Sequence, residues 1–170
     1  MSLARQNYHE ECEAGVNKQI NLELFASYVY MSMAYHFDRD DVDLKGFFKF
    51  FKKSSDEERE HAEMLMTFQN KRGGRIVLQD VKAPGQNTWK DGLEAMKAAL
   101  DLEKHVNQSL LDLHGIATKH EDAQMTDYLE GHFLAHQVDS IKELAGYVAN
   151  LTRVGPGLGE FQFDKLTLND

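Results

Sequence analysis

Hydrophobic positions recur every three to four residues over four long stretches of this chain, which is the spacing of a helix with one buried face. The stretches predict helices over roughly residues 8–37, 44–72, 89–119 and 123–153, with a short amphipathic helix over 158–168. The chain has two prolines, Pro84 and Pro156, and both lie outside the long stretches. The pattern therefore predicts an all-α protein.

Local signals mark the ends of these helices. Asn7 with Glu10, and Thr88 with Asp91, have the spacing of a helix cap and its reciprocal acid. The glycine pair at 73–74 suits a helix end, because glycine readily adopts the left-handed conformation found there. We therefore expect the caps at positions 7 and 88.

The connectors predict how the helices are arranged. The polar breaks at 38–43 and 120–122 are short, so the helices on either side of each should form antiparallel hairpins. Residues 75–88 form a connector that can run the length of the bundle. We therefore expect one domain over residues 1–170, a four-helix bundle with one long crossover and a short fifth helix.

The apolar positions of each long helix form a stripe along its buried face, called its core stripe here. Each of the four core stripes carries a polar residue near the middle of its helix. In chain order, these residues are Glu23, then Glu58 and His61, then Glu103, then Gln137. The middle of a helix lies at the same height whichever way the helix points, so we expect these side chains to meet in one buried layer.

Three carboxylates in one buried layer would be untenable without cations, because an unpaired buried charge costs on the order of several kcal/mol. No Lys or Arg lies near them on the stripes. Carboxylate oxygen with one imidazole nitrogen suits iron or manganese better than metals that prefer thiolate. One glutamate on an apparent stripe usually marks a solvated face, but four such coincidences favour a metal centre.

Tyr30 lies two turns from Glu23 on the same stripe. Such a tyrosine is commonly a core aromatic, although its hydroxyl needs a buried partner, for which Glu103 is the candidate. Both interpretations stay open at this point.

Charge narrows the class of partner. The chain has 28 acidic residues against 19 Lys and Arg, a formal charge of -9, which repels nucleic acid and anionic lipid and attracts cations. No apolar run reaches the length of a signal peptide or membrane helix, so we expect a cytoplasmic protein without nucleic-acid or membrane partners. Cys12 is the single cysteine; it excludes an intrachain disulfide and is interpreted as a surface thiol.

At the polar residues of the buried layer the chain resembles an animal ferritin of the heavy, ferroxidase-active type. Among animal ferritins it is most similar in kind to those of invertebrates. The resemblance covers nearly the whole chain. It is carried by Arg5–His9, Gln19–Tyr30, Phe37–Val42, Glu57–Glu63, Arg72–Ile76 and Leu102–Lys104. It implies the ferritin-like bundle topology.

The resemblance also implies a function. Two ferrous ions per subunit would be oxidised with dioxygen as co-substrate, and the iron stored as ferric oxide mineral. The container would be a 24-subunit shell, built from this chain alone or mixed with other ferritin subunits. The resemblance places the first iron site on Glu23, Glu58 and His61, with Glu58 as the bridge, and the second on Glu103 and Gln137. Tyr30 resembles the tyrosine beside that centre.

Two further groups follow from the resemblance alone. One resembles acids that pass iron on or seed mineral: Glu57, Glu60 and Glu63. The other resembles the lining of a three-fold pore that draws cations inward: His114, Asp127 and Glu130. By spacing alone, the first group is an ordinary solvated acidic face and the second consists of ordinary surface residues.

The chain departs from the resemblance at a few positions. His136 stands where an acid is usual on the path to the centre, and Ser140 replaces the histidine of a second Glu-x-x-His pair. The second iron site is therefore expected to be poor in ligands and to release oxidised iron. The resemblance implies that the fifth helix lies around a four-fold pore of the shell. Gln162 and Leu166 in this helix also differ from the usual residues, so the polarity of that pore cannot be inferred from the resemblance.

Three other functions stay open. A di-iron oxygenase or peroxidase-like bundle would normally keep both Glu-x-x-His pairs. A non-catalytic structural ferritin subunit would lack part of the centre. A purely structural bundle would bury the same polar residues as a network without metal.

Overall fold

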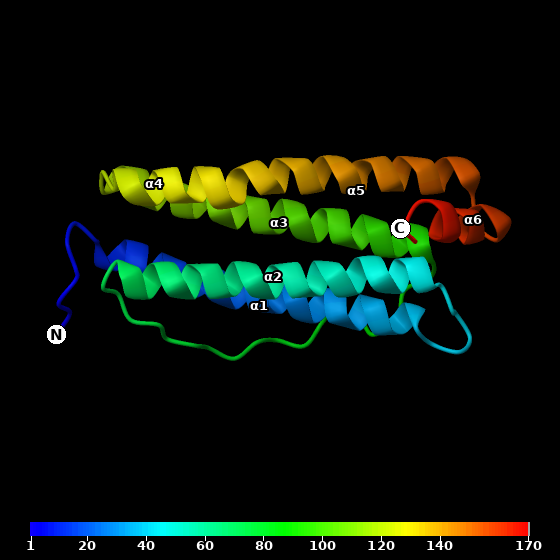
Figure 1. Ribbon diagram of the computed structural model, residues 1–170, viewed down its shortest axis with the longest axis horizontal. Coiled ribbons are helices and arrows are strands. Elements are labelled where there is room, and N and C mark those ends of the chain that lie inside the picture. Colours follow the sequence, from blue (N-terminus) through cyan, green and yellow to red (C-terminus); the bar gives the residue numbers. More distant parts are fainter. Residues whose placement is uncertain (170) are drawn as a thin grey trace.

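The computed structural model describes residues 1–169, and these residues form helices, turns and one long connector, without a strand (Figure 1). The elements in chain order are α1 (Glu10–Phe37), α2 (Lys45–Lys71), α3 (Gly92–Lys119), α4 (Ala123–Leu129), a π-helical turn η1 (Glu130–Leu134), α5 (Ala135–Val154) and α6 (Leu158–Leu166). The all-α fold and its four long helical stretches are confirmed. No helix within residues 1–169 is long and apolar enough to cross a membrane.

The helices pair as two antiparallel hairpins, α1 with α2 and α3 with α4–η1–α5 (Figure 1). The green connector between α2 and α3 runs along the α1–α2 pair (Figure 1). The amides of Asn17 and Asn21 fix it there: they donate to the backbone oxygens of Arg75 at 3.0 Å and Asp80 at 3.1 Å. The four-helix bundle with one long crossover is therefore confirmed.

Two helix starts differ from the expected ones. His9, rather than Asn7, caps α1, and its Nδ1 accepts from the backbone N–H of Glu11 at 3.0 Å. Asn7 instead adopts a left-handed conformation with φ of 50°. Asp91, rather than Thr88, caps α3 by accepting from a backbone N–H of the first turn at 2.9 Å. Histidine is not among the common caps, which is why the sequence pattern missed it.

The fourth long helix is interrupted, contrary to the expectation of one regular helix. At η1 the backbone N–H of Ala135 bonds to the carbonyl of Glu130, five residues back. The extra residue in this turn shifts the register of all that follows, and such turns are frequent at functional sites. The π-turn ends three positions before Gln137.

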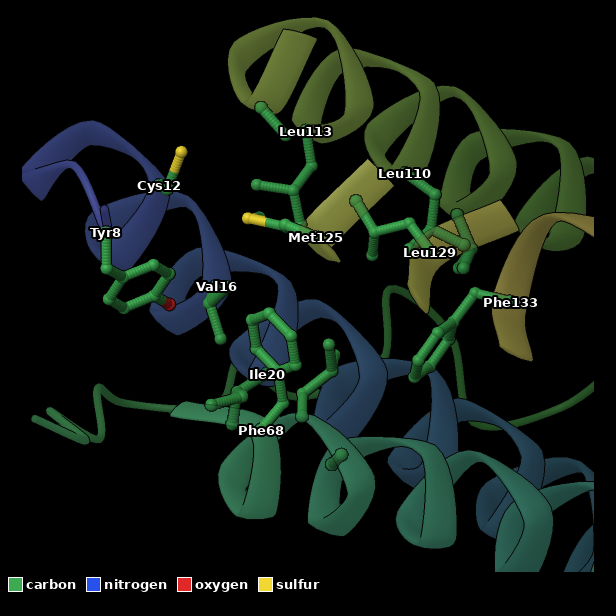
Figure 2. Close-up of a cluster of buried hydrophobic side chains, with 14 of the residues drawn as sticks. Tyr8, Cys12, Val16, Ile20, Phe68, Leu110, Leu113, Met125, Leu129 and Phe133 are labelled. Carbon is green, nitrogen blue, oxygen red and sulfur yellow. The ribbon is translucent and has the colours of Figure 1, made fainter. Parts of the chain in front are cut away.

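The apolar core has two parts. Figure 2 shows the one between the start of α1 and the α4 end of the bundle, where Val16 and Leu110 are fully buried. Cys12 belongs to this cluster with 0% exposure, so its interpretation as a surface thiol was wrong. The other part is rich in stacked aromatic rings, among them Phe37 and Phe47, whose centroids lie 4.8 Å apart.

Helix α6 covers the aromatic end and contributes more than apolar contact. Phe163 is buried against Phe47, with ring centroids 5.8 Å apart. The Asp164 carboxylate accepts from the backbone N–H of Phe47 at 2.8 Å, and Glu160 accepts from that of Gly92 at 2.8 Å. Since α2 has no capping side chain of its own, an acid from the far end of the chain caps it.

The face of α6 that carries Leu158, Gln162 and Leu166 at a spacing of four points away from the bundle. Leu158 is 70% exposed and Leu166 is 76% exposed, and Gln162 between them is exposed as well. This apolar face is therefore free in the single chain.

Candidate metal centre

Three of the expected ligands converge from the first hairpin. Glu23 on α1 and Glu58 and His61 on α2 place their ligand atoms within 4.8 Å of one another. The Nδ1 of His61 lies 4.0 Å from Oε2 of Glu23 and 3.6 Å from Oε2 of Glu58. A spacing of three residues puts Glu58 and His61 on one face of α2, and the close packing of α1 brings Glu23 opposite them.

The second hairpin supplies the other side of the layer. The Glu103 carboxylate on α3 accepts from the Tyr30 hydroxyl at 2.5 Å and from the Gln137 amide at 2.8 Å. The same amide nitrogen donates to the Glu103 backbone carbonyl at 3.1 Å. The hydrogen bond between Tyr30 and Glu103 decides the question that the sequence left open for Tyr30. The expected mid-helix residues lie together in one layer.

This layer is buried and short of hydrogen-bond partners. The three glutamates are at most 4% exposed. Within residues 1–169, Oε2 of Glu23 and Oε2 of Glu58 have no hydrogen-bond partner. These two oxygens are the ones that face His61. Orphaned buried acceptors that converge on one point are the arrangement that a cation satisfies.

Burial perturbs the acids strongly. Burial raises the pKa of Glu58 to about 8, and the negative charge of Glu103 adds to the effect. Burial, followed by the neighbouring Glu58 carboxylate, raises the pKa of Glu23 well above its ordinary value. Burial also raises the pKa of Tyr30 well above its ordinary value, and the Glu103 charge adds to it. Without a cation, the layer therefore holds protons at neutral pH, which a bound divalent ion would replace.

Sequence reasoning missed Gln19, which supports Glu23. The Gln19 amide donates to Oε1 of Glu23 at 3.1 Å, and its own oxygen accepts from the Ser109 hydroxyl at 2.7 Å. This contact occupies one oxygen of Glu23 and leaves Oε2 for a ligand. Such outer contacts commonly orient metal ligands. Gln19 lies one turn before Glu23, so its place on the buried face was the available signal.

A cavity of about 280 Å³ connects the layer to the surface of the chain. It runs from Glu58 and Glu103 past His136 and Ser140 to the exposed Glu143. The His136 ring lies 5.0 Å from the His61 ring, and its Nε2 lies 3.4 Å from the Ser140 hydroxyl. His136 and Ser140, two of the residues that depart from the resemblance, therefore line the cavity that leads to the layer.

Glu57, Glu60 and Glu63, which resemble acids that pass iron on or seed mineral, lie in different surroundings. Glu57 lines the cavity, and its carboxylate lies 3.8 Å from Nζ of Lys53. Glu60 and Glu63 are exposed on α2, and Glu63 lies 3.5 Å from Nε of Arg59. The structure therefore brings only Glu57 next to the buried layer.

The expected pore residues are only partly gathered in the single chain. Nε2 of His114 lies 3.4 Å from Oε2 of Glu130, and both line a surface pocket at the turn between α3 and α4. Asp127 is exposed one turn from Glu130 and does not line that pocket.

Comparison with known proteins decides the family. The profile of the ferritin-like domain matches residues 13–154. The chain belongs to the ferritin family. Among its relatives in this family are a protein named soma ferritin from Lymnaea stagnalis and one named ferritin-1 heavy chain from Schistosoma mansoni. They are 69% and 63% identical to this chain over 169 residues, which is 99% of this chain and 97% and 98% of theirs. A ferritin heavy chain from Echinococcus granulosus is 61% identical over 168 residues, 99% of this chain and 97% of its own.

Proposed function

We propose that this chain is an iron-storing ferritin subunit that oxidises Fe(II) with dioxygen in the buried layer. The observation that carries the proposal is the convergence of Oε2 of Glu23, Oε2 of Glu58 and Nδ1 of His61, two orphaned oxygens and an imidazole in a protein of the ferritin family. Iron is the substrate here, two ions per subunit, and dioxygen accepts their electrons.

The donor set favours the oxidised product. Oxidation from Fe(II) to Fe(III) adds one positive charge, and carboxylate oxygens in a low-dielectric interior stabilise the higher charge more. In this proposal Glu23 and His61 hold the first ion, Glu58 bridges, and Glu103 with Gln137 holds the second. The Tyr30 hydroxyl donates to one oxygen of Glu103 and so competes with the second ion for that oxygen.

The second position is the weaker one. Both oxygens of Glu103 already accept hydrogen bonds, and its partner Gln137 is a neutral amide. Ser140 adds no imidazole. Weak retention at this position suits a storage protein, which passes each oxidised ion on. We further propose that Glu57 and His136, which line the cavity, receive it, and that Glu60 and Glu63 seed mineral.

Residues 1–170 would act as one domain in a cytoplasmic 24-subunit shell, alone or with other ferritin subunits, and His114, Asp127 and Glu130 would line its three-fold pore. Exposed apolar side chains support assembly, since contiguous exposed apolar surface commonly marks an interface. They lie on α6 and along α1 and the crossover: Leu158, Phe161, Leu166, Tyr28, Met31, Tyr35, Val77 and Leu78. Light scattering and negative-stain microscopy should show large hollow particles, and a monomer or dimer at micromolar concentration would refute the storage function.

The decisive test removes the bridge and its neighbour. Glu58→Ala with His61→Gly should abolish fast oxidation while the particles still assemble, measured by stopped-flow absorbance after Fe(II) is added in air. Glu60→Ala, an acid on the same helix outside the layer, serves as the matched control and should keep the parent's fast phase. Parental oxidation rates in the double variant would mean that the centre lies elsewhere.

A further inference from the structure

A second cluster of metal-ligating side chains lies at the other end of α1, well away from the buried layer. His9, Glu11 and His120 place their ligand atoms within 4.8 Å of one another. Glu11 precedes Glu23 by twelve positions on α1, so the cluster is about 18 Å from the layer along the helix. His9 and Glu11 are exposed, and the side chain of His120 is 17% exposed.

The fold holds these residues together, although His120 lies more than a hundred positions after His9 and Glu11 in the chain. His9 caps α1 and His120 caps the C-terminal end of α3. Arg72 fixes the turn after His120, because both of its terminal nitrogens bond to the Asp122 carboxylate at 2.9 Å. The two imidazole rings lie face to face, with centroids 3.5 Å apart and an interplanar angle of 10°.

Two of the three proposed ligand atoms are already adjacent. Nε2 of His120 lies 3.1 Å from Oε2 of Glu11. The hydrogen bonds from His120 and then from Lys119 lower the pKa of Glu11. The Glu11 carboxylate is thus anionic at neutral pH. The C-terminal end of α3, where His120 lies, carries a partial negative charge that favours a cation.

We propose that His9, Glu11 and His120 bind a divalent transition-metal ion of the zinc or copper class at this outer end of the bundle. Two imidazoles and one carboxylate are a donor set that these metals prefer, with water completing the shell. This site is independent of the proposed iron oxidation, since it shares no residue with the buried layer.

Binding requires a local change at both histidines. The His120 proton that Glu11 accepts from Nε2 would move to Nδ1 when an ion takes its place. The Nδ1 of His9 accepts from the Glu11 amide, so the neutral ring carries its proton on Nε2. An ion on Nε2 would move that proton to Nδ1 and break the cap, and an ion on Nδ1 would displace the amide directly. In a tetrahedral zinc site the ligand atoms lie about 3.3 Å apart, so the exposed His9 ring must also turn towards the other two residues. The ion therefore competes with the helix cap for His9.

The test compares zinc binding by the assembled parent and by His9→Ser with His120→Gln. Serine keeps a cap acceptor for α1 and glutamine keeps a hydrogen-bonding partner for Glu11, so the double variant loses the imidazoles and little else. Calorimetric titration with Zn²⁺ should show one zinc fewer per subunit, or at least a tenfold loss of affinity for one class of site. Iron oxidation should stay within about twofold of the parent. An unchanged zinc isotherm would overturn the proposal.

A matched histidine control guards against non-specific loss. His105→Gln with His132→Gln removes two other exposed imidazoles and should leave the zinc stoichiometry of the outer site unchanged. The same loss in this control would show that exposed histidines bind zinc without a built site, and would also overturn the proposal.

Copper provides an independent readout of the ligands. With Glu58→Ala and His61→Gly as background, one equivalent of Cu²⁺ per subunit should give an electron paramagnetic resonance spectrum with coupling to two nitrogens. That coupling should vanish when His9→Ser and His120→Gln are added. Lys119→Met should tighten binding several-fold, because the ammonium 3.3 Å from Oε2 of Glu11 competes with the ion. A two-nitrogen spectrum that survives the loss of both histidines would rule out this ligand set.

Discussion

Hairpin α1–α2 and hairpin α3–α5 meet at the same buried layer but bring unlike groups to it. The first contributes Glu23, Glu58 and His61, with two carboxylate oxygens left without hydrogen bonds within residues 1–169. The second contributes Glu103, whose two oxygens are already bonded, and the neutral Gln137. The difference teaches that ligand count alone does not rank the two proposed metal positions, because an oxygen that already has a donor gains less from an ion.

The largest expected effect tests this asymmetry directly. Glu23→Ala removes an anionic ligand whose Oε2 is free, so it should weaken binding of the first divalent ion about 100-fold. Gln137→Ala removes a neutral side chain and should weaken the second ion about tenfold. Zinc titration in the absence of iron measures both constants. Equal losses in the two variants would contradict the ranking of the hairpins.

The pH dependence of stability tests the acids of the first hairpin. In the metal-free protein, the pKa of Glu58 is raised from 4.5 to about 8, so between these values the folded chain holds a proton that the unfolded chain has lost. This stabilisation is complete below about pH 4.5 and is lost as pH rises through about 8, at up to about 1.4 kcal/mol per pH unit. Thermal unfolding in the presence of a chelator, from pH 5 to 8, should show the midpoint falling.

Glu58→Gln is the matched control for that trend, because glutamine has the same shape and no titration in this range. Its unfolding midpoint should vary less with pH than the parent's. Equal slopes in the two proteins would mean that Glu58 is not the group that holds the proton.

A smaller effect is expected from the hydroxyl that satisfies Glu103. Tyr30→Phe leaves one buried oxygen of Glu103 without its donor, which should lower the unfolding free energy of the metal-free protein by about 1–2 kcal/mol. The freed oxygen should at the same time bind the second ion more readily. Tyr128→Phe, which removes a hydroxyl bonded to the Met64 carbonyl at 3.2 Å, is the control and should not change ion binding. Weaker binding of the second ion in Tyr30→Phe would show that the hydroxyl orients Glu103 rather than competing for it.

The smallest expected effect concerns Asp127 and Glu130, the acids of the second hairpin that are proposed to line the pore. Asp127→Ala with Glu130→Ala should slow iron oxidation about threefold at low salt and have no effect at high salt, because steering by surface charge is screened. As the control, Glu94→Ala with Asp101→Ala removes the same charge from exposed positions on α3. Stopped-flow kinetics across ionic strength separate the two, and identical salt dependence would remove Asp127 and Glu130 from the uptake route.

Much of this architecture could be predicted from the sequence because it depends on periodic burial. The stripes placed Glu23, Glu58 and Glu103 at one height, and their convergence follows from helix geometry alone. The pairing of Tyr30 with Glu103 was also accessible, since a buried hydroxyl must find an acceptor.

What the sequence did not reveal depends on contacts between distant segments or on local competition. The caps from Glu160 and Asp164 join α6 to helices far away in the chain, and no local pattern encodes them. The buried positions across the π-turn, Leu129, Phe133 and Gln137, are spaced by four, which regular helices also show, so periodicity does not detect the turn. Cys12 was misplaced because a lone thiol was assigned by residue type rather than by its position one turn before Val16 on the buried face.

The contacts of α6 also have a consequence for the order of events during synthesis. The first turns of α2 and α3 receive acceptors from Asp164 and Glu160, which are synthesised after both of these helices. The aromatic end of the bundle therefore cannot close with these two caps until α6 has been synthesised. Closure of this end and presentation of Leu158 on the outer face of α6 come with the same segment. A chain that stops before α6 thus lacks both the two caps and the apolar face that α6 exposes.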